Sequence, residues 1–308
     1  MSRHCDLRNL SLAALCSVGV FSAIPRSVFA QQTPASPNWA ASVDQAFGRS
    51  GASQPQGVRR YGFPRADLAV MASGVQVAPA LALGSWVAFK DAGDGRVMMM
   101  GDLVLTESEV GAVMRALQSG GVKQTALHNH VLHESPRIMY MHIAGHDDAA
   151  KLARTIRGAL AETGTPLEAP AAATSPTTID LDTGAITHTL GHSGRVNGGV
   201  YQVSVPRRET IREAGRVVPP AMGVATAINF QPTGGGKAAI TGDFVMVASE
   251  VNDVIRALQE NGIEVTALHS HMLTETPRLL FMHFWANDDA VKLARGLRAA
   301  LDRTASKR

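Results

Sequence analysis

The chain has 308 residues and a formal charge of +3, and 45% of its residues are hydrophobic. It contains no basic run and no stripe of arginine and aromatic residues, so nucleic acid is excluded as an expected partner. Its two cysteines, Cys5 and Cys16, both lie near the N-terminus. If that segment is removed, the remaining chain offers no cysteine nucleophile, thiolate zinc site or iron–sulfur cluster.

The first thirty residues have the pattern of a secretory signal peptide. Arg3 and Arg8 precede an apolar run over residues 10–24, which is too short to span a bilayer. Small residues then lead up to Ala30, where we expect cleavage. The sequence therefore predicts a signal peptide over 1–30, a periplasmic or secreted protein, and no transmembrane span in the mature chain.

Lipid anchoring is the alternative for this segment, since Cys16 is a possible acceptor. The preceding residues, Ala13, Ala14 and Leu15, form a poor lipoprotein cleavage sequence. We therefore expect cleavage near Ala30 rather than an anchor at Cys16.

The rest of the chain divides into two similar parts. Residues 31–57 are predicted to form an N-terminal segment with a short helix over 39–47 that Gly48 ends. Repeat domain 1 is expected over 58–163 and repeat domain 2 over 198–308. Between them, 164–197 is predicted to be a linker, because it contains a stretch rich in Ala, Pro and Thr.

Each repeat shows the same order of hydrophobic patterns. β-rich runs and helical spacings alternate in the first repeat, with strands expected at 85–89, 97–105, 122–132 and 138–144 and helices at 106–118 and 149–160. The order β-β-α-β-β-α predicts an α+β fold, with antiparallel sheets and helices on one face. Two tandem pseudo-symmetric units of this kind should pack as an intramolecular pseudo-dimer.

One block occurs twice, as TALHNHVLHESPR from residue 125 and TALHSHMLTETPR from residue 266, an offset of 141 positions. Each copy contains His-x-His-x-x-x-Glu, and a further histidine follows. The candidate metal ligands are therefore His128, His130, Glu134 and His142 in the first copy and His269, His271, Glu275 and His283 in the second.

Strand alternation predicts the geometry of these residues. His128 and His130 are two apart and should share a face. A hairpin centred near Ser135 would place His128 opposite His142 and His130 opposite Tyr140. We therefore expect three imidazoles on one face in each repeat.

Three imidazoles and a carboxylate are a suitable ligand set for a divalent transition metal such as Zn²⁺, Mn²⁺, Fe²⁺, Ni²⁺ or Cu²⁺. The alternative is structural, because histidines of a half-buried strand can simply bond to their neighbours. The sequence does not decide whether the two clusters share one cleft.

Other residues beside the clusters are candidates for ligand binding. Arg137 and Arg278 follow the two blocks and could hold an anion, although each could equally pair with a nearby glutamate or a helix end. Tyr140 is the third candidate. Asp102, in a Gly-Asp pair that recurs at 242–243, could accept a hydrogen bond from a ligand histidine or serve as a strand-edge residue.

The segments ALHNHVLHESPR, ALHSHMLTETPR, GDFVMVASEVNDVIRAL and GGVYQVSVPR resemble the LppY/LpqO family of exported bacterial proteins, a domain family of unassigned function. The resemblance covers nearly the whole mature chain. It implies an envelope or secreted location and a two-repeat architecture, and it implies no reaction, cofactor or substrate.

The sequence therefore favours an exported two-repeat protein with a histidine cluster per repeat that binds a divalent transition metal. Such a protein could be a metal-dependent enzyme acting on a small polar or anionic molecule, and the first copy, with Tyr140, His133 and His146 nearby, is the favoured active one. The alternative is a non-catalytic binding module for a small molecule or an envelope component, with structural histidines. No catalytic residue is assigned.

Overall fold

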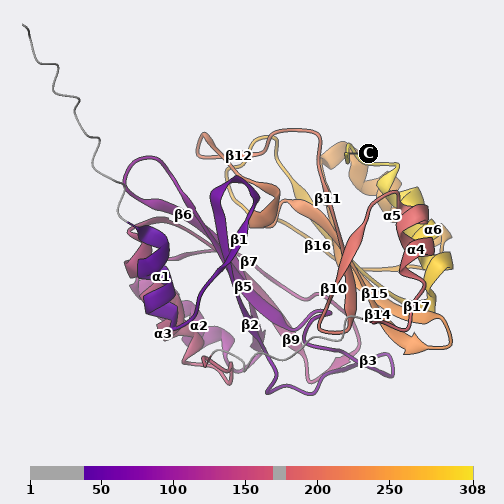
Figure 1. Ribbon diagram of the computed structural model, residues 1–308, viewed down its shortest axis with the longest axis horizontal. Helices are drawn as coiled ribbons and strands as arrows, with labels where there is room; N and C mark the ends of the chain where they lie inside the picture. Colours follow the sequence, from indigo (N-terminus) through magenta and orange to yellow (C-terminus); the bar gives the residue numbers. More distant parts are fainter. Residues whose placement is uncertain (1–37, 169–177, 308) are drawn as a thin grey trace, which may run out of the picture. The chain divides into compact units, whose positions relative to one another are not determined.

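The computed structural model describes residues 38–168 and 178–307, so the predicted signal peptide lies outside the described residues. The described chain is an α+β structure with two six-stranded sheets, each with three helices against it (Figure 1). This confirms the predicted fold class. In the described part of the chain, none of the helices combines the length and the apolar character needed to cross a membrane.

The first repeat opens with helix α1 and two strands and then follows the predicted β-β-α-β-β-α order. Its elements are α1 (Trp39–Phe47), β1 (Ala52–Gln54), β2 (Val58–Pro64), β3 (Met71–Ala72), β4 (Val75–Gln76), β5 (Gly84–Asp91), β6 (Val97–Thr106), α2 (Val110–Ser119), β7 (Lys123–His128), β8 (Glu134–Ser135), β9 (Ile138–Asp147) and α3 (Ala149–Leu160).

The second repeat follows the same plan. Its elements are α4 (Thr183–Leu190), β10 (Gly194–Asn197), β11 (Val200–Pro206), β12 (Arg212–Glu213), β13 (Arg216–Val217), β14 (Ala225–Gly234), β15 (Lys237–Met246), α5 (Val251–Glu260), β16 (Glu264–His269), β17 (Leu280–Asp289) and α6 (Ala290–Leu301). Helix α4 and strand β10 lie in the segment that the sequence predicts to be a linker.

The two large sheets have matching strand orders. The first runs β1-β2-β5-β6-β9-β7 and the second β10-β11-β14-β15-β17-β16. Every strand pair in both sheets is antiparallel. Strands β7 and β16 are therefore corresponding edge strands, and both histidine blocks begin in them.

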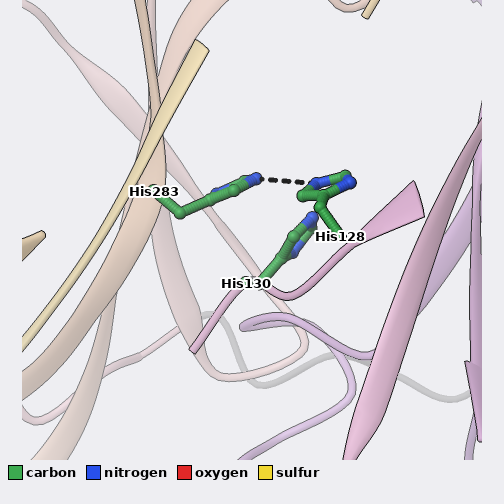
Figure 2. A group of neighbouring side chains, drawn as sticks. All are labelled: His128, His130 and His283. Carbon is green, nitrogen blue, oxygen red and sulfur yellow. Dashed lines mark hydrogen bonds between the residues drawn. The ribbon is translucent and has the colours of Figure 1, made fainter. Parts of the chain in front are cut away.

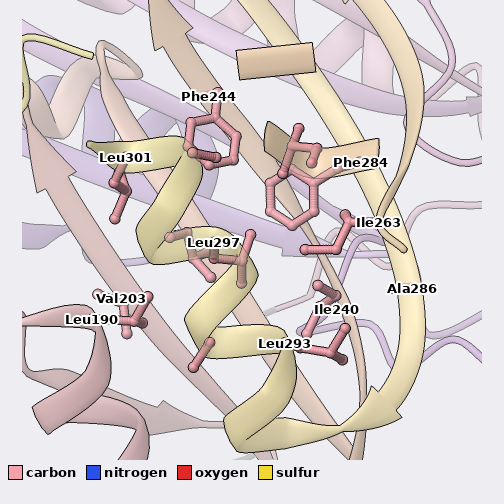
Figure 3. Packing of buried hydrophobic residues seen from close by; sticks show 14 of the residues in the cluster. Leu190, Val203, Ile240, Phe244, Ile263, Phe284, Ala286, Leu293, Leu297 and Leu301 are labelled. Atoms are coloured by element: carbon pink, nitrogen blue, oxygen red, sulfur yellow. The ribbon is translucent and has the colours of Figure 1, made fainter. Parts of the chain in front are cut away.

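Helices cover one face of each sheet because their apolar residues recur at helical spacing. In α6, Leu293, Leu297 and Leu301 lie on one side and pack against Phe244 and Phe284 of the second sheet (Figure 3). The helix begins where the Asp289 carboxylate accepts a hydrogen bond from the Lys292 backbone N–H. Asp148 caps α3 in the same way.

The opposite faces of the two sheets pack against each other. Strand β6 is buried on both faces: Met99 and Leu103 contact the helices, whereas Met98 and Met100 belong to a cluster with Val245 and Phe281 of the second repeat. A second mixed cluster joins residues of the first repeat to the second sheet. The layers are therefore helices, sheet, sheet and helices, and the inter-sheet layer contains residues of both repeats.

Candidate metal centre

Six imidazoles from the two repeats form one cluster between the sheets. The Nε2 atoms of His128 and His283, from different repeats, lie 3.3 Å apart (Figure 2). The rings of His128 and His269 stack with centroids 3.7 Å apart. The sequence left open whether the two clusters share a cleft, and the structure brings them together.

Strand alternation places the cluster on the inter-sheet face. In the first sheet Asp102 of β6 is opposite His142 of β9, and in the second Asp243 of β15 is opposite His283 of β17. Neighbouring residues along each strand point into the helix-covered core instead. Two carboxylates and two imidazoles therefore enter this layer from the centres of the sheets.

The predicted hairpin register is wrong by two residues. Strand β7 ends at His128, which is opposite Tyr140, while Ala126 is opposite His142. The reason is the connection after β7, because it does not turn tightly at Ser135; that residue pairs with β3 instead. A shift of two keeps every side chain on its face, so the prediction that the imidazoles share a face survives the error.

The imidazoles contact the opposite repeat as closely as their own. The ring centroids of His130 and His283 lie 3.8 Å apart, and those of the matching pair, His271 and His142, lie 3.7 Å apart. Within one repeat, His128 and His130 have centroids 5.2 Å apart. The pseudo-twofold relation of the repeats therefore passes through the cluster.

Backbone carbonyls fix the tautomers of two histidines in the second repeat. Nδ1 of His283 lies 2.6 Å from the Gly242 oxygen, and Nδ1 of His271 lies 3.0 Å from the Gly223 oxygen. A carbonyl oxygen only accepts hydrogen bonds, so both Nδ1 atoms carry the proton. Their Nε2 atoms then present lone pairs to the cluster, which is the arrangement that orients metal-binding histidines in proteins.

Gly223 requires the conformation that only glycine adopts without cost. Its φ is +88°, and an added Cβ would lie 2.7 Å from the Trp86 ring of the first repeat. Glycine thus lets the Gly223 carbonyl reach His271 while Trp86 packs against the loop.

Several buried polar atoms of the cluster form no hydrogen bond within the described residues. They are Nε2 of His130, His142, His269 and His271, Nδ1 of His128, and Oδ1 of Asp102 and Asp243. Buried polar atoms in proteins are nearly always satisfied. So many orphaned donor and acceptor atoms in one place are expected where an ion or ordered ligand completes the site.

Each carboxylate lies beside an imidazole of its own repeat. Asp243 Oδ2 is 3.0 Å from Nε2 of His271, and Asp102 Oδ2 is 3.4 Å from Nε2 of His130. Because Nδ1 of His271 holds the proton, Nε2 and the carboxylate oxygen are both lone-pair donors. Two such atoms come this close comfortably when a cation lies between them.

Burial determines the protonation state of the imidazoles. The side chain of His283 is 3% exposed, and burial together with the neighbouring His130 lowers its pKa well below the usual value. Burial lowers the pKa of His130, His142 and His271 for the same reason. These rings are therefore neutral at physiological pH, which is the form that binds metals.

Two threonines of the repeated block cross between the repeats. The Thr125 hydroxyl donates to the His271 carbonyl at 2.7 Å, and the Thr266 hydroxyl donates to the His130 carbonyl at 2.5 Å. Thr125 and Thr266 are equivalent positions. Each repeat therefore holds the histidine loop of the other.

The predicted glutamate ligands lie at the turns. Glu134 Oε1 accepts from the Ile138 backbone N–H at 3.1 Å, and Glu275 Oε1 accepts from that of Leu279 at 2.9 Å. Among the described residues, the groups whose ligand atoms lie within 4.8 Å of one another contain no glutamate: His128, His130 and His283; His128, His142 and His269; and Asp243, His269 and His271.

The remaining predicted residues differ between the repeats. Arg278 donates to Glu275 at 3.0 Å, which is the predicted structural alternative, whereas Arg137 is exposed. Tyr140 is fully buried and stacks on His130 with ring centroids 3.3 Å apart. Phe281 stacks on His271 in the same way at 3.5 Å.

Glu134, which is half-buried, and Tyr140, which is fully buried, are two acids near the cluster. Burial raises the pKa of Glu134 to about 7 and the pKa of Tyr140 well above its usual value. Glu134 Oε2 and the Tyr140 hydroxyl form no hydrogen bond within the described residues. The second repeat has Phe281 in place of this hydroxyl.

The sequence did not indicate the roles of the threonines or of Gly223. For Asp102 it left open two roles, an acceptor for a ligand histidine or a strand-edge residue. The threonines carried a signal, because Thr125 and Thr266 begin both copies of the block. Gly223 carried none, since the repeat offset aligns it with Ala82.

Comparison with known proteins gives a family and no activity. Residues 41–162 and 184–303 each match a family described as Domain of Unknown Function (DUF1259), one copy in each repeat. No curated protein matches the chain.

Two solved structures are weakly similar. A trimeric bacterial microcompartment shell protein, PduB, is 14% identical over 82% of this chain and 88% of its own, with a TM-score of 0.20. EtuB from Clostridium kluyveri is 10% identical over 82% of this chain and 90% of its own, with a TM-score of 0.19. Likenesses at these TM-scores say nothing about function.

Proposed function

Because the chain belongs to the family described as Domain of Unknown Function (DUF1259), whose description names no activity, we propose a function from the site itself. We propose that the protein binds divalent transition metal at one centre that both repeats build. The proposed ligands are the six clustered histidines, with Asp102 and Asp243 as the carboxylates. Glu134 and Glu275, the carboxylates expected from the sequence, lie at the turns and are not included.

The single observation that carries the proposal is the set of orphaned buried nitrogens. Nε2 of His130, His142, His269 and His271 have no hydrogen-bond partner among the described residues. A buried polar atom without a partner costs about 1–3 kcal/mol. Metal bound at this centre would satisfy these lone pairs, whereas ordinary structural histidines would each have a protein partner.

The donor chemistry favours a nitrogen-seeking metal. Neutral imidazoles suit Zn²⁺, Cu²⁺, Ni²⁺ and Fe²⁺, whereas Mn²⁺ prefers carboxylate and water oxygens. Two nitrogens on one ion are at most about 4.2 Å apart, while the candidate groups extend to 4.8 Å. Metal binding is therefore expected to draw the rings slightly together.

Burial of the cluster supports a centre that links the repeats. The side chains of His142, His271 and His283 are 3–4% exposed. Ligands from both repeats then connect the two sheets, so the metal would stabilise the native state by mass action.

A metal-dependent enzyme is the second candidate, and the half-buried Glu134 near Tyr140, which stacks on His130, favours it. Glu134 has a pKa of about 7, which suits a general acid or base at neutral pH. Only a small polar or anionic molecule would reach so buried a site. The Glu134→Gln variant should keep the metal and lose any turnover detected in a screen of small esters, phosphates and hydroxy acids.

We also propose that the chain is exported and is a member of the LppY/LpqO group, as its segments suggest. The test is fractionation of cells expressing the full chain, followed by N-terminal sequencing of the product. Export predicts a mature protein beginning near Gln31. A cytoplasmic product that keeps its first thirty residues would overturn this part of the proposal.

Metal analysis of the purified protein tests the central proposal. The chain is stripped with a chelator, reconstituted with Zn²⁺, Cu²⁺ or Fe²⁺, passed over a desalting column and analysed for metal by mass spectrometry. Wild type should retain metal. His128→Ala and His269→Ala should each lower retention strongly, because each ring touches both halves of the cluster.

His133→Ala is the matched control, since His133 is exposed in the same block. Its metal content should equal that of wild type. Absence of bound metal from a folded wild-type protein with every metal tried would refute the proposal.

A further inference from the structure

The cluster contains two groups of candidate ligands that share no residue. Among the groups whose ligand atoms lie within 4.8 Å of one another, two share no residue: His128, His130 and His283; and Asp243, His269 and His271. The repeat offset of 141 converts His128 into His269 and His130 into His271. The same offset relates Asp102 to Asp243 and His142 to His283, which completes both sets.

We propose that the centre holds two metal ions, each bound by ligands exchanged between the repeats. One set is His128, His130 and Asp102 of the first repeat with His283 of the second. The other set is His269, His271 and Asp243 of the second repeat with His142 of the first. This inference rests on the proposed metal binding and adds the number of ions and the assignment of their ligands.

Interatomic distances support this partition. Two imidazole nitrogens on one tetrahedral ion at 2.0–2.1 Å lie about 3.3 Å apart. Nε2 of His128 and Nε2 of His283 are 3.3 Å apart, although they belong to different repeats. In the other set, Nε2 of His271 and Oδ2 of Asp243 are 3.0 Å apart, which is also suitable for two ligands of one ion.

The ring positions repeat across the two sets. His130 and His283 have centroids 3.8 Å apart, and their counterparts His271 and His142 have centroids 3.7 Å apart. The pairs His128–His130 and His269–His271 are 5.2 and 5.0 Å apart. In both cases the close cross-repeat pair consists of two imidazoles that the proposal assigns to the same ion.

A single ion explains less of the site. The third group, His128, His142 and His269, would hold one ion between the repeats. That arrangement leaves the orphaned Nε2 atoms of His130 and His271 and both carboxylates without a partner. Two ions engage all six imidazoles and both aspartates, so the requirement that buried polar atoms be satisfied favours two.

Two ions in one buried cluster define a class of chemistry. Paired metal ions about 3.5–4 Å apart commonly share a bridging water or oxygen ligand and act together on a small oxygen-containing molecule. Each set here supplies four protein ligands with one negative charge, so two dications keep a net positive charge that attracts an anionic bridging ligand.

Metal counting on the wild-type chain is the first test and needs no variant. Chelator-stripped protein is titrated with Zn²⁺ and, separately, with Co²⁺, whose visible spectrum reports its coordination. Two ions per chain are expected. One ion per chain would overturn the two-ion inference and leave the shared centre standing, whereas no bound ion would overturn the proposed function as well.

Double variants test the exchange of ligands. His130→Ala with His283→Ala removes two ligands of one set, so one ion should remain. His130→Ala with His142→Ala removes a ligand from each set, so both ions should be lost or strongly weakened.

The opposite pattern would mean that each repeat binds its own ion and would overturn the exchange. Thermal unfolding of the metal-free variants shows whether each one folds. Should a double variant fail to fold, the corresponding Gln substitutions, which keep a polar side chain, are counted in its place.

Discussion

The two repeats agree in their frameworks and differ around the histidines. Arg65 and Arg207 lie at matching positions directly after β2 and β11. Each donates to the glutamate that precedes a helix and to a strand carbonyl. Around the cluster, the second repeat fixes His271 and His283 through Gly223 and Gly242.

The described residues show no equivalent carbonyl bonds in the first repeat. There the chain has a buried tyrosine hydroxyl instead, where the second repeat has Phe281. The comparison shows that the two copies of a duplicated sequence can keep the same stabilising contacts in each repeat. At the site that they share, the two copies can still have different residues and different roles. In this protein the second repeat orients two of the proposed ligand histidines, while the first places a buried tyrosine and a half-buried glutamate near the cluster. The sequence favoured the first copy as the active one, whereas the ligands held most firmly are in the second.

Removing the framework arginines should cause the largest losses of stability, and the loss should be equal in the two repeats. Arg65 is 1% exposed and donates to the buried Val104 carbonyl and the partly buried Glu109 carboxylate, so Arg65→Met leaves both acceptors without this donor. We expect a loss of about 3–5 kcal/mol in the free energy of unfolding, and the same from Arg207→Met. Urea unfolding followed by circular dichroism measures both.

Arg256→Met is the control for these variants, because its ion pair with Asp253 is exposed; it should cost less than about 1 kcal/mol. A clear difference between Arg65→Met and Arg207→Met would break the view that the two frameworks are equivalent.

Substitution of the two aspartates of the centre should have the next largest effect, and the loss of metal affinity should differ between the repeats. Asp243 lies closer to its histidine than Asp102 does, at 3.0 against 3.4 Å. We expect Asp243→Asn to weaken metal binding by about 100-fold and Asp102→Asn by about 10-fold. Competition with a chromophoric chelator measures the affinities.

Asp94→Asn is the matched control, since Asp94 pairs with arginines away from the cluster. Equal losses from Asp102→Asn and Asp243→Asn would mean that the two halves bind metal alike and that the difference in distance has no consequence.

Exchanging the residues that stack on the histidines should give effects of opposite sign. The Tyr140 hydroxyl is buried without a partner among the described residues, so Tyr140→Phe should raise the free energy of unfolding by about 1–2 kcal/mol. Phe281→Tyr buries a new hydroxyl and should lower it by a similar amount. If Tyr140→Phe proves destabilising in the metal-free protein, its hydroxyl has a stabilising partner and the first repeat is better satisfied than its contacts indicate.

Two glutamates of the first repeat, Glu134 and Glu109, should make the stability of the protein depend on pH in opposite ways. Burial raises the pKa of Glu134 to about 7. Below about pH 4.5 the carboxyl is protonated in both the folded and the unfolded chain. Between about pH 4.5 and pH 7 the unfolded chain ionises this carboxyl while the folded chain keeps it protonated, so the native state loses stability relative to Glu134→Gln until the loss is complete above pH 7. After allowance for solvent screening, we expect a loss of about 1–2 kcal/mol above pH 7.

Glu109 should show the opposite sign. Burial opposes its ionisation, but Arg65 and two backbone N–H groups outweigh burial and lower its pKa. Wild type should therefore be favoured over Glu109→Gln at neutral pH and should lose that advantage as the pH falls below about 4.5. Unfolding curves of the metal-free variants at several pH values test both; parallel profiles would show that neither carboxyl is shifted.

These comparisons also show what the sequence could predict. Period-two alternation keeps His128 and His142 on one face when the register changes by an even number of residues, and for that reason the two-residue error did not matter. Period and composition likewise predict the helix over 149–160, which is α3, because helical spacing depends on neighbours in the sequence.

Contacts between the repeats were beyond the sequence. The repeat offset indicates a pseudo-dimer but does not say which faces meet, so the contact between His128 and His283 had no local signal. Helix α4 follows a segment rich in Ala, Pro and Thr, a composition that typifies linkers. Gly223 acts through the carbonyl that it presents to His271, and that role follows only from its position in the fold.

The hydrogen bonds that cross between the repeats should give the smallest effects. Thr125→Val and Thr266→Val keep the shape of the side chain and remove one hydroxyl donor each, at about 1 kcal/mol. Thr→Ser at the same positions should restore most of the loss, because the hydroxyl returns. A threonine that only stabilises the fold would change the unfolding free energy and leave the visible spectrum of the Co²⁺-loaded protein as in wild type.

We expect that spectrum to change in both valine variants, since each threonine holds the backbone of a histidine in the opposite repeat. Asn129 also donates to the Thr266 carbonyl across the same boundary, so the strand at Thr266 has a second attachment, for which the described residues show no counterpart at Thr125. Thr125→Val should therefore disturb the centre more than Thr266→Val. The reverse order would mean that the carbonyls of Gly223 and Gly242 already hold the second repeat's histidines, and that the first repeat's loop is the one that depends on its neighbour.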